Sequence, residues 1–326
     1  MTTASDVPLV YVIVLNHNGA DHLPYCLPSI CATDYPRLEI IIVDNASTDG
    51  SLALASASPV RTLKNDRNLG WSGGNNLGIR EALAAGARYV VLANSDIRVH
   101  PRWIAEAVAA AELSPDVAVI GFDVHEPQPG DADRDAGYSD ACRRWAPPTT
   151  TSTPEYVGGM AMLVRGAAFE QLGLIDENFF AYGEENDFQI RARRAGYRIL
   201  GINVPVWHYG QAGFGKTPFR ASLLQTENNI QLLLKHHGPM ELLRAVVGHS
   251  SRFRSAARTP PSTAVERRLR GGSTIRMAAI LLLAVARVVV KTPAILRRRA
   301  EHDRLIATAR ARRSEQLTHA SDGVKD

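Results

Sequence analysis

The chain has few cysteines and lacks the features of a secreted protein. Its 326 residues include only Cys26, Cys31 and Cys142, at irregular spacing. So few cysteines exclude a disulfide framework or a zinc site built from cysteine pairs, and they favour a reducing compartment. The N-terminus has no basic segment before its first apolar run, so we expect no secretory signal. No internal repeat is present, and the length suits one large or two ordinary domains.

Long apolar runs are also missing. The longest uncharged run near the C-terminus, residues 277–286, has ten residues, whereas a membrane-spanning helix needs about 20. Arg287 and Lys291 interrupt any longer run. Two interpretations remain open for this segment: an amphipathic helix in the membrane interface, or a helix packed on the protein core.

Charge is distributed unevenly along the chain. The net charge is +4, but residues 251–326 contain 17 Lys and Arg against 6 Asp and Glu, a net of +11, which leaves −7 for residues 1–250. A basic C-terminal segment indicates an anionic membrane surface, a nucleic acid or a solvated tail. Because no aromatic residues alternate with its arginines, we expect no nucleic-acid binding.

Short apolar runs alternate with helical patterns in the first 121 residues. Runs rich in Val and Ile are typical of parallel strands buried on both faces, and they occupy residues 9–15, 38–44, 60–65, 89–93 and 117–121. Helical spacing predicts helices at residues 21–32, 73–87 and 101–113. This alternation predicts a doubly wound α/β domain.

The secondary-structure pattern is less regular after residue 121. Residues 122–155 are rich in Pro, Asp and Thr and show no period, so we expect a long functional or mobile connection there. Order returns at residues 156–165, and a helical pattern covers about 217–236.

Polar residues follow two of the predicted strands directly. Asp44 and Asn45 end one strand, and Asn94 and Asp96 end another. Open α/β sheets bind ligands at the carboxyl ends of their strands, although the same residues are equally suited to ordinary turns. Between these strands, "NLGWSGGNN" leads to a helix expected to begin near Asn75. Its glycines could admit a diphosphate, but their spacing fits neither the P-loop nor the dinucleotide motif.

Three acids crowd the start of another predicted helix. Glu184, Glu185 and Asp187 suit a helix N-terminus, and Asp187 can pair with Arg191 four residues later. A third acid at that place is a candidate general base. Further along, His208 could join Asp96 in binding a divalent cation, or it could be structural.

Taken in order, these segments resemble the inverting family 2 glycosyltransferases with the GT-A fold. The resemblance covers about residues 8–235 and rests on "VIVLNHNG", "EIIIVDNASTDGS", "NLGWSGGNNLGI", "VLANSD", "VGGMAMLVRGAAFEQLGLIDENFFAYGEENDFQIRARRAGY" and "VWHYG". It is strongest for the rhamnosyltransferase-like branch that builds bacterial cell-envelope polysaccharides. The resemblance implies a mostly parallel sheet flanked by helices in a GT-A domain at residues 1–240. Within it, about 8–121 would bind the nucleotide and about 156–236 the acceptor, while 241–326 would form a basic, amphipathic helical extension.

The resemblance also implies roles for individual residues. Asp96 and His208 would bind Mn²⁺ or Mg²⁺, and Glu185, next to Glu184, would be the catalytic base. Asn94 stands where the family often has a first acid, and Glu185 is one methylene longer than the usual Asp. The residues expected to bind the nucleotide-sugar are Asn16, Asn18, Asp44, Asn45, Asn68, Gly74, Asn75, Asn94 and Asp96.

The implied function is transfer of a sugar, such as rhamnose, from a dTDP- or UDP-sugar to a polyprenyl-diphosphate-linked or polysaccharide acceptor. The absence of Q-x-x-R-W, which marks processive members, favours addition of one or a few sugars. The basic C-terminus would hold the enzyme at the cytoplasmic face of the plasma membrane. The alternatives are an inactive sugar-nucleotide-binding protein and a nucleotidyltransferase, although the latter's basic glycine-rich N-terminal loop is missing.

Overall fold

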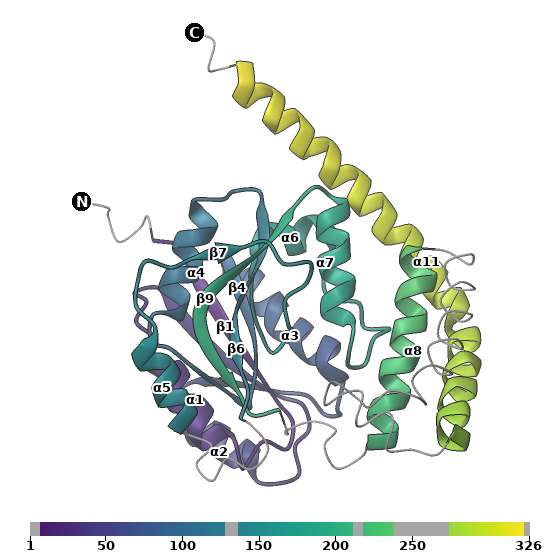
Figure 1. The fold of residues 1–326 in the computed structure, drawn as a ribbon, viewed down its shortest axis with the longest axis horizontal. Coiled ribbons are helices and arrows are strands. Elements are labelled where there is room, and N and C mark those ends of the chain that lie inside the picture. The colour runs from purple at the N-terminus through teal and green to yellow at the C-terminus, as the bar shows by residue number, and fades with distance from the viewer. Residues whose placement is uncertain (1–6, 128–135, 211–217, 238–273, 323–326) are drawn as a thin grey trace.

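The protein is a three-layer α/β structure (Figure 1). The computed structural model describes residues 7–127, 136–210, 218–237 and 274–322. Its elements are β1 (Val10–Asn16), α1 (Leu23–Cys31), β2 (Leu38–Asp44), α2 (Ser51–Ala57), β3 (Arg61–Lys64), α3 (Gly70–Ala84), β4 (Tyr89–Asn94), β5 (Ile97–Val99), α4 (Trp103–Glu112), β6 (Val117–His125), α5 (Ala136–Arg144), β7 (Thr151–Ser152), β8 (Ala161–Arg165), α6 (Gly166–Leu172), α7 (Glu184–Arg194), β9 (Arg198–His208), α8 (Pro218–His236) and α11 (Thr274–Asp322).

The strands form one sheet in the order β3-β2-β1-β4-β8-β6-β9-β5, and β7 pairs with β9. The half from β3 to β4 is parallel, as the sequence predicts. The other half is mixed, because β8 runs antiparallel to β4 and β6, and β5 and β7 run antiparallel to β9. The carboxyl ends of β1, β2 and β4 therefore lie at one edge. Strand β5 follows β4 after a turn and pairs with the end of β9, so the end of β9 lies at the same edge.

Side chains alternate between two apolar cores on opposite faces of the sheet, as the two-residue period of a strand requires. Val12 and Val14 of β1 face α1 and α4, whereas Ile13 faces the core that contains α3, α6 and α7. The α-helical layers thus hold the sheet on both sides, and the α/β fold class predicted from the sequence is confirmed.

Helix α3 begins at Gly70, five residues before the predicted start near Asn75. Its glycines allow the helix to lie very close to β1. A Cβ atom on Gly74 would lie 2.4 Å from Leu15 Cδ1, and one on Gly78 would lie 2.7 Å from Ile13 Cγ2. Tertiary packing here outweighs the low helix propensity of glycine.

The expected long connection at 122–155 contains more structure than its sequence suggests. Strand β6 extends to His125, helix α5 follows, and β7 adds to the sheet. Residues 128–135 lie outside the described residues.

Helix α11 lies beside α8 and continues past α6 and α7 (Figure 1). Its buried residues Ile280, Ala284 and Val288 pack with Leu223 and Ile230 of α8, and Ile306 and Ala309 belong to a core of the sheet. Within the described chain, the stretch Ala278–Glu315 of this helix is long and apolar enough to cross a membrane by length and composition. The division at residue 240 stays a prediction, since residues 238–273 lie outside the described ranges.

Candidate functional site

Two loops meet at the ends of β1 and β2 through buried polar groups. Asn16 donates from Nδ2 to Asp44 Oδ1 (2.8 Å), and the backbone N–H of Ser47 donates to Asp44 Oδ2 (3.0 Å). Asn18 Oδ1 accepts from the backbone N–H of Thr48 (2.7 Å). Asp44 is only 1% exposed, whereas Asn18 and Thr48 are exposed. Asn18 and Thr48 are therefore accessible at this edge, whereas Asp44 is buried and holds Asn16 and Ser47, and the nucleotide-binding role of Asp44 stays a prediction.

Asn45 connects this edge to the start of α3. Its Nδ2 donates to Asn68 Oδ1 and to the carbonyl of Gly70, both at 2.9 Å. Its Oδ1 accepts from the backbone N–H of Leu69 (3.0 Å) and from Asn65 Nδ2 (3.1 Å). Asn45 and Asn68, predicted as binding residues, thus also fix the shape of the loop.

The first amides of α3 are already hydrogen-bonded to the protein. Gly70 N–H donates to Asn68 Oδ1 (2.8 Å), and Trp71 N–H donates to the carbonyl of Phe180 (2.6 Å). Ser72 Oγ donates to the carbonyl of Phe179 (2.6 Å). The glycine-rich segment therefore holds the loop that leads to Glu184 and Glu185, a role that its sequence did not indicate.

Gly74 and Asn75 lie inside α3 rather than on an open loop. Asn75 is fully buried, and its Nδ2 donates to the carbonyl of Trp71 (2.9 Å). Its Oδ1 has no hydrogen-bond partner among the residues that the structure describes. The nucleotide-binding role of these two residues stays a prediction.

Asp96 and His208, 112 positions apart, lie together at the end of β4 and β9. His208 Nε2 is 3.5 Å from Asp96 Oδ1, and His208 Nδ1 is 3.1 Å from Glu126 Oε1. Burial lowers the pKa of His208, but the hydrogen bonds and charges of Asp96 and Glu126 outweigh burial and raise that pKa above its usual value.

This pair fits a divalent cation. A carboxylate that orients the far nitrogen of an imidazole is the usual support of a metal-bound histidine, and Glu126 is placed to do this for His208. Asp96 and His208 would supply the oxygen and nitrogen ligands, a set that suits Mn²⁺.

Glu184 and Glu185 begin α7 behind Gly183, a residue with a φ of 92°. Burial raises the pKa of Glu184 well above its usual range, and the charge of Glu185 raises it further. Burial also raises the pKa of Glu185, whose Oε2 accepts the Gly183 N–H at 3.0 Å. Glu184 is 4% exposed and its Oε2 has no hydrogen-bond partner among the described residues. Burial therefore favours the protonated form of Glu184 more strongly than that of the half-buried Glu185.

Trp71, which was not predicted from the sequence, contacts Asn94 and lies close to Gly159. Its Nε1 donates to Asn94 Oδ1 at 3.0 Å. A Cβ atom on Gly159 would lie 3.2 Å from both Trp71 Cζ2 and Glu185 Cβ. Trp71 and Glu185 thus both lie close to Gly159. The sequence signal for Trp71 was an aromatic residue directly after Gly70 within the glycine-rich segment.

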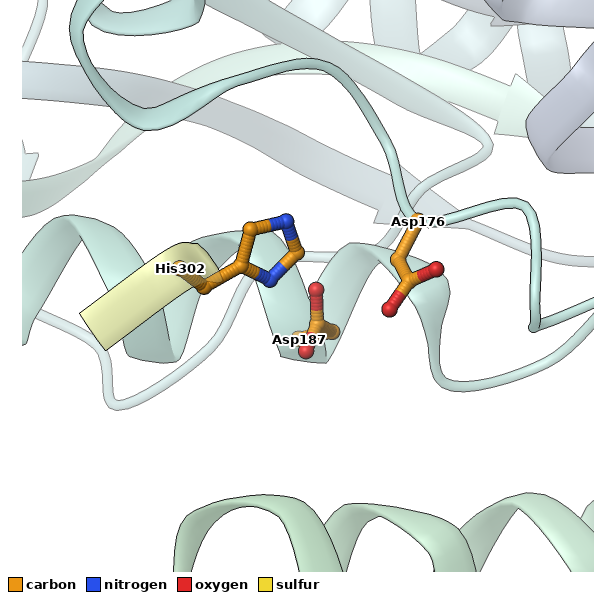
Figure 2. A group of neighbouring side chains, drawn as sticks. All are labelled: Asp176, Asp187 and His302. Carbon is orange, nitrogen blue, oxygen red and sulfur yellow. The ribbon is translucent and has the colours of Figure 1, made fainter. Parts of the chain in front are cut away.

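A second group of possible metal ligands, Asp176, Asp187 and His302, lies between the loop before α7, α7 itself and α11 (Figure 2). Lys235 Nζ occupies the space between the two carboxylates, 2.5 Å from Asp176 Oδ2 and 2.6 Å from Asp187 Oδ1. Arg191 adds a second cation, 2.9 Å from Asp187 Oδ2, which confirms the predicted pair.

Protein cations compensate both carboxylates of this group without a metal ion. Burial, followed by the nearby Arg191 and Lys235, lowers the pKa of His302 to about 2, so this imidazole is neutral. Two buried carboxylates remain, together with the buried Arg191 and Lys235 and the partly exposed Arg298, whose Nε is 3.6 Å from Asp176 Oδ1. We therefore interpret the group as a structural ion cluster that fixes α8 and α11 on α7, and the metal-binding role of Asp96 and His208 stays a prediction.

Comparisons with known proteins bear on the family and the fold. The sequence model of glycosyl transferase family 2 matches residues 11–171. An N-acetylglucosaminyl-diphospho-decaprenol L-rhamnosyltransferase of Mycobacterium tuberculosis is 28% identical over 242 residues, 64% of this chain and 78% of that protein. A low-salt glycan biosynthesis hexosyltransferase of Haloferax volcanii is 28% identical over 58% of this chain and 62% of its own length. The aligned region thus spans less than two thirds of that relative.

Solved structures share the fold. A mannosyltransferase of Pyrobaculum calidifontis in complex with GDP-Man and Mn²⁺ has a TM-score of 0.52 at 18% identity, and the match covers 94% of this chain and 87% of that one. Residues 1–349 of S. aureus TarS in complex with UDP have a TM-score of 0.51 at 16% identity, covering 94% and 92%.

Proposed function

This chain belongs to glycosyl transferase family 2 and has the GT-A fold, and we propose that it transfers one sugar, with inversion, from a nucleotide-diphospho-sugar to a lipid-linked or polysaccharide acceptor of the cell envelope. The observation that carries the proposal is the proximity of Asp96 to His208 at the end of β4, where Asn94 accepts a hydrogen bond from Trp71. This arrangement supports a metal site at Asp96 and His208, and we propose Glu185 as the base.

The reaction is a single displacement. Glu185 accepts the proton of the acceptor hydroxyl as that oxygen bonds to the anomeric carbon, and the bond from this carbon to the diphosphate breaks. Asp96 and His208 would hold the Mn²⁺ or Mg²⁺ that, when bound, neutralises charge on the departing diphosphate. Attack from the face opposite the leaving group inverts the configuration.

The relatives support a choice of substrates. One is named as a rhamnosyltransferase that acts on a decaprenol-diphosphate-linked sugar, so dTDP-rhamnose and a polyprenyl-diphosphate acceptor are the first pair to test. UDP-sugars are the next donors, because a structure of the same fold was solved with UDP.

Calorimetric titration tests the donor site. The wild type is titrated with dTDP, UDP and GDP, with and without Mn²⁺, beside Asp96→Ala and the exposed control Asp123→Ala. The proposal expects one of the nucleotides to bind the wild type. Its affinity should be highest with Mn²⁺ and should fall in Asp96→Ala, whereas the control Asp123→Ala should bind as tightly as the wild type. If none of the three nucleotides binds the wild type, the transferase proposal fails. Binding without turnover of any donor would instead favour an inactive sugar-nucleotide-binding protein.

Helix α11 supports a position at the membrane surface. One side of it exposes apolar side chains, and the cations Arg287 and Lys291 within this stretch pair with the buried Glu227 of α8. Burying each such apolar side chain would contribute up to about 1.5–3 kcal/mol. The exposed apolar residues are Leu282, Leu283, Val285, Val289, Val290 and Leu296. We therefore place the enzyme peripherally at the cytoplasmic face of the plasma membrane, with α11 in the interface.

Sedimentation with anionic liposomes tests this position. The wild type should pellet at low salt, and the double variant Leu282→Ser with Val289→Ser should remain mostly in solution. Leu113, 85% exposed after α4, provides a control, because Leu113→Ser removes similar apolar surface far from α11. Equal pelleting of all three proteins, or none by the wild type, refutes the membrane proposal.

A further inference from the structure

Asn228 of α8 holds the segment that precedes the acids at the start of α7. Its Nδ2 donates to the carbonyl of Ala181 at 2.7 Å and to that of Tyr182 at 2.8 Å. An amide NH₂ group has two N–H donors, and here each can serve one carbonyl. Asn228 is only 1% exposed. One buried side chain therefore fixes the peptide groups on both sides of the Tyr182 Cα.

The backbone at Tyr182 needs this support. Its φ is 73°, and Gly183 follows with a φ of 92°. Glycine tolerates the left-handed region, whereas a residue with a Cβ atom is strained there and keeps that conformation only where surrounding contacts hold it. The two bonds from Asn228 are such contacts, because the peptide groups that they hold define φ and ψ of Tyr182.

The peptide group between Tyr182 and Gly183 links Asn228 to Glu185. Its carbonyl oxygen accepts from Asn228, and its N–H, on Gly183, donates to Glu185 Oε2 at 3.0 Å. A trans peptide group is planar, with its C=O and N–H pointing in opposite directions. The bond that holds the oxygen on α8 therefore directs the N–H toward the start of α7. Rotation of this one peptide group would break both bonds.

Helix α8 is held in place independently of Asn228. Lys235, further along the helix, lies 2.6 Å from Asp187 Oδ1 of α7. Glu227, directly before Asn228, is buried and pairs with Lys291 of α11. Substitution of Asn228 should therefore release the loop without detaching the helix.

We propose that Asn228 is a positioning residue, which orients the Glu185 carboxylate through the peptide group between Tyr182 and Gly183. This inference rests on the proposed function, in which Glu185 accepts the proton of the acceptor hydroxyl. Asn228 acts through the loop and needs no contact with the substrate. The geometry of the base then depends on α8, which lies beyond the residues 11–171 that the family model matches.

The first test measures sugar transfer by the wild type and Asn228→Ala over a range of pH. Loss of the two bonds lets the peptide group rotate, so kcat should fall about tenfold to a hundredfold, a part of what a general base contributes. Nucleotide affinity should stay unchanged. The Gly183 N–H favours the ionised form of Glu185. Its displacement should therefore raise the pKa of Glu185 and move the acid limb of kcat/KM to higher pH, while the neighbouring Glu184 is retained.

Asn76→Ala is the matched control. Asn76 of α3 is also 1% exposed, and its Nδ2 donates to the carbonyl of Ile175 and to Glu177 Oε1, both at 2.8 Å. The control removes a buried amide that holds another segment, so it should lower stability in urea but keep the wild-type acid limb. Asn228→Ser retains one donor, should give intermediate losses, and replaces Asn228→Ala if that variant does not fold.

A double-mutant cycle tests whether Asn228 acts through Glu185. Glu185→Gln removes the carboxylate that the loop orients. Adding Asn228→Ala to this variant should lower kcat by less than about twofold, because the effects of residues that act through one group are not additive.

The outcomes distinguish this inference from the proposed function. The inference is wrong, and the transferase proposal stands, if Asn228→Ala keeps the wild-type kcat and acid limb, if Asn76→Ala shifts the limb equally, or if Asn228→Ala costs the same with and without Glu185. Failure of both Asn228→Ala and Asn228→Ser to fold would also overturn it in favour of a purely structural role. A wild type that transfers no sugar from any donor overturns both proposals.

Discussion

Replacement of Gly70 by alanine tests how the glycine-rich segment supports the catalytic loop. Gly70 has a φ of 74°, and a Cβ atom there would lie 2.1 Å from the carbonyl oxygen of Phe180. Gly86 has almost the same φ, 76°, but nothing lies within 4 Å of its added Cβ. The two substitutions therefore share the cost of left-handed backbone, about 1–2 kcal/mol. They differ only in the close contact.

The contact at Gly70 adds a second cost. A methyl group would force Phe180 away and break the hydrogen bond from Trp71 N–H, which leaves buried groups unpaired at about 1–3 kcal/mol. We expect Gly70→Ala to lower the free energy of unfolding by about 2–5 kcal/mol, and Gly86→Ala by about 1–2 kcal/mol. Urea unfolding followed by circular dichroism measures both.

Activity should separate the two variants further. Displacement of Phe180 moves the loop that ends at Gly183, so Gly70→Ala should also lose transfer activity under conditions in which it is folded. Gly86→Ala should keep it. Equal destabilisation of the two variants, or full activity of Gly70→Ala, would refute the role assigned to this contact.

Three further predictions concern charged groups. Lys235→Met leaves the buried Asp176 and Asp187 without their shared cation and should destabilise the fold by about 3–5 kcal/mol in urea unfolding; a loss below 1 kcal/mol would contradict the ion cluster. The pKa of Asp187 is held well below its usual value, with burial opposed by Arg191, Lys235 and His236. Its stabilisation is therefore present above the ordinary Asp pKa of about 3.9, and Asp187→Asn should remove the stability that the wild type loses as pH falls below that value. Because burial raises the pKa of Glu185, kcat/KM should fall on the acid side at a pH above the ordinary Glu pKa of about 4.3, and an acid limb at or below 4.3 would contradict its role.

Glu126, which contacts His208, provides a fifth prediction. Glu126→Ala should lower Mn²⁺ affinity about tenfold, because Glu126 orients His208 through Nδ1. Unchanged affinity would show that His208 needs no such support or does not bind the metal.

The sheet edge could be predicted from the sequence because it depends on local order. Asp44 and Asn94 come directly after apolar strands, and parallel strands must place their carboxyl ends together. The start of α3 at Gly70 could not be predicted from the sequence, because the position of α3 depends on contacts of its glycines with Leu15 and Ile13 of β1.

Contacts between segments far apart in the sequence could not be predicted from it either. His208 reaches Asp96 only because β5 runs antiparallel to β9, with Ile97 opposite His208. The sequence presents both residues but contains no local signal for this pairing. The hydrogen bond from Trp71 to Asn94 likewise depends on how α3 crosses the end of β4. The sequence thus showed which residue types could take part in binding or catalysis, whereas the contacts between them depend on the fold.

The most direct test of the account is sugar transfer by Glu185→Gln. The wild type and this variant are incubated with Mn²⁺, dTDP-rhamnose or a UDP-sugar, and a synthetic polyprenyl-diphosphate-linked N-acetylglucosamine, and the product is quantified by mass spectrometry. Glu170→Gln, an exposed change on α6, is the control. The account predicts transfer by the wild type and the control, and a rate about 10²–10⁴-fold lower in Glu185→Gln with unchanged nucleotide affinity. Transfer by Glu185→Gln at the wild-type rate would contradict it.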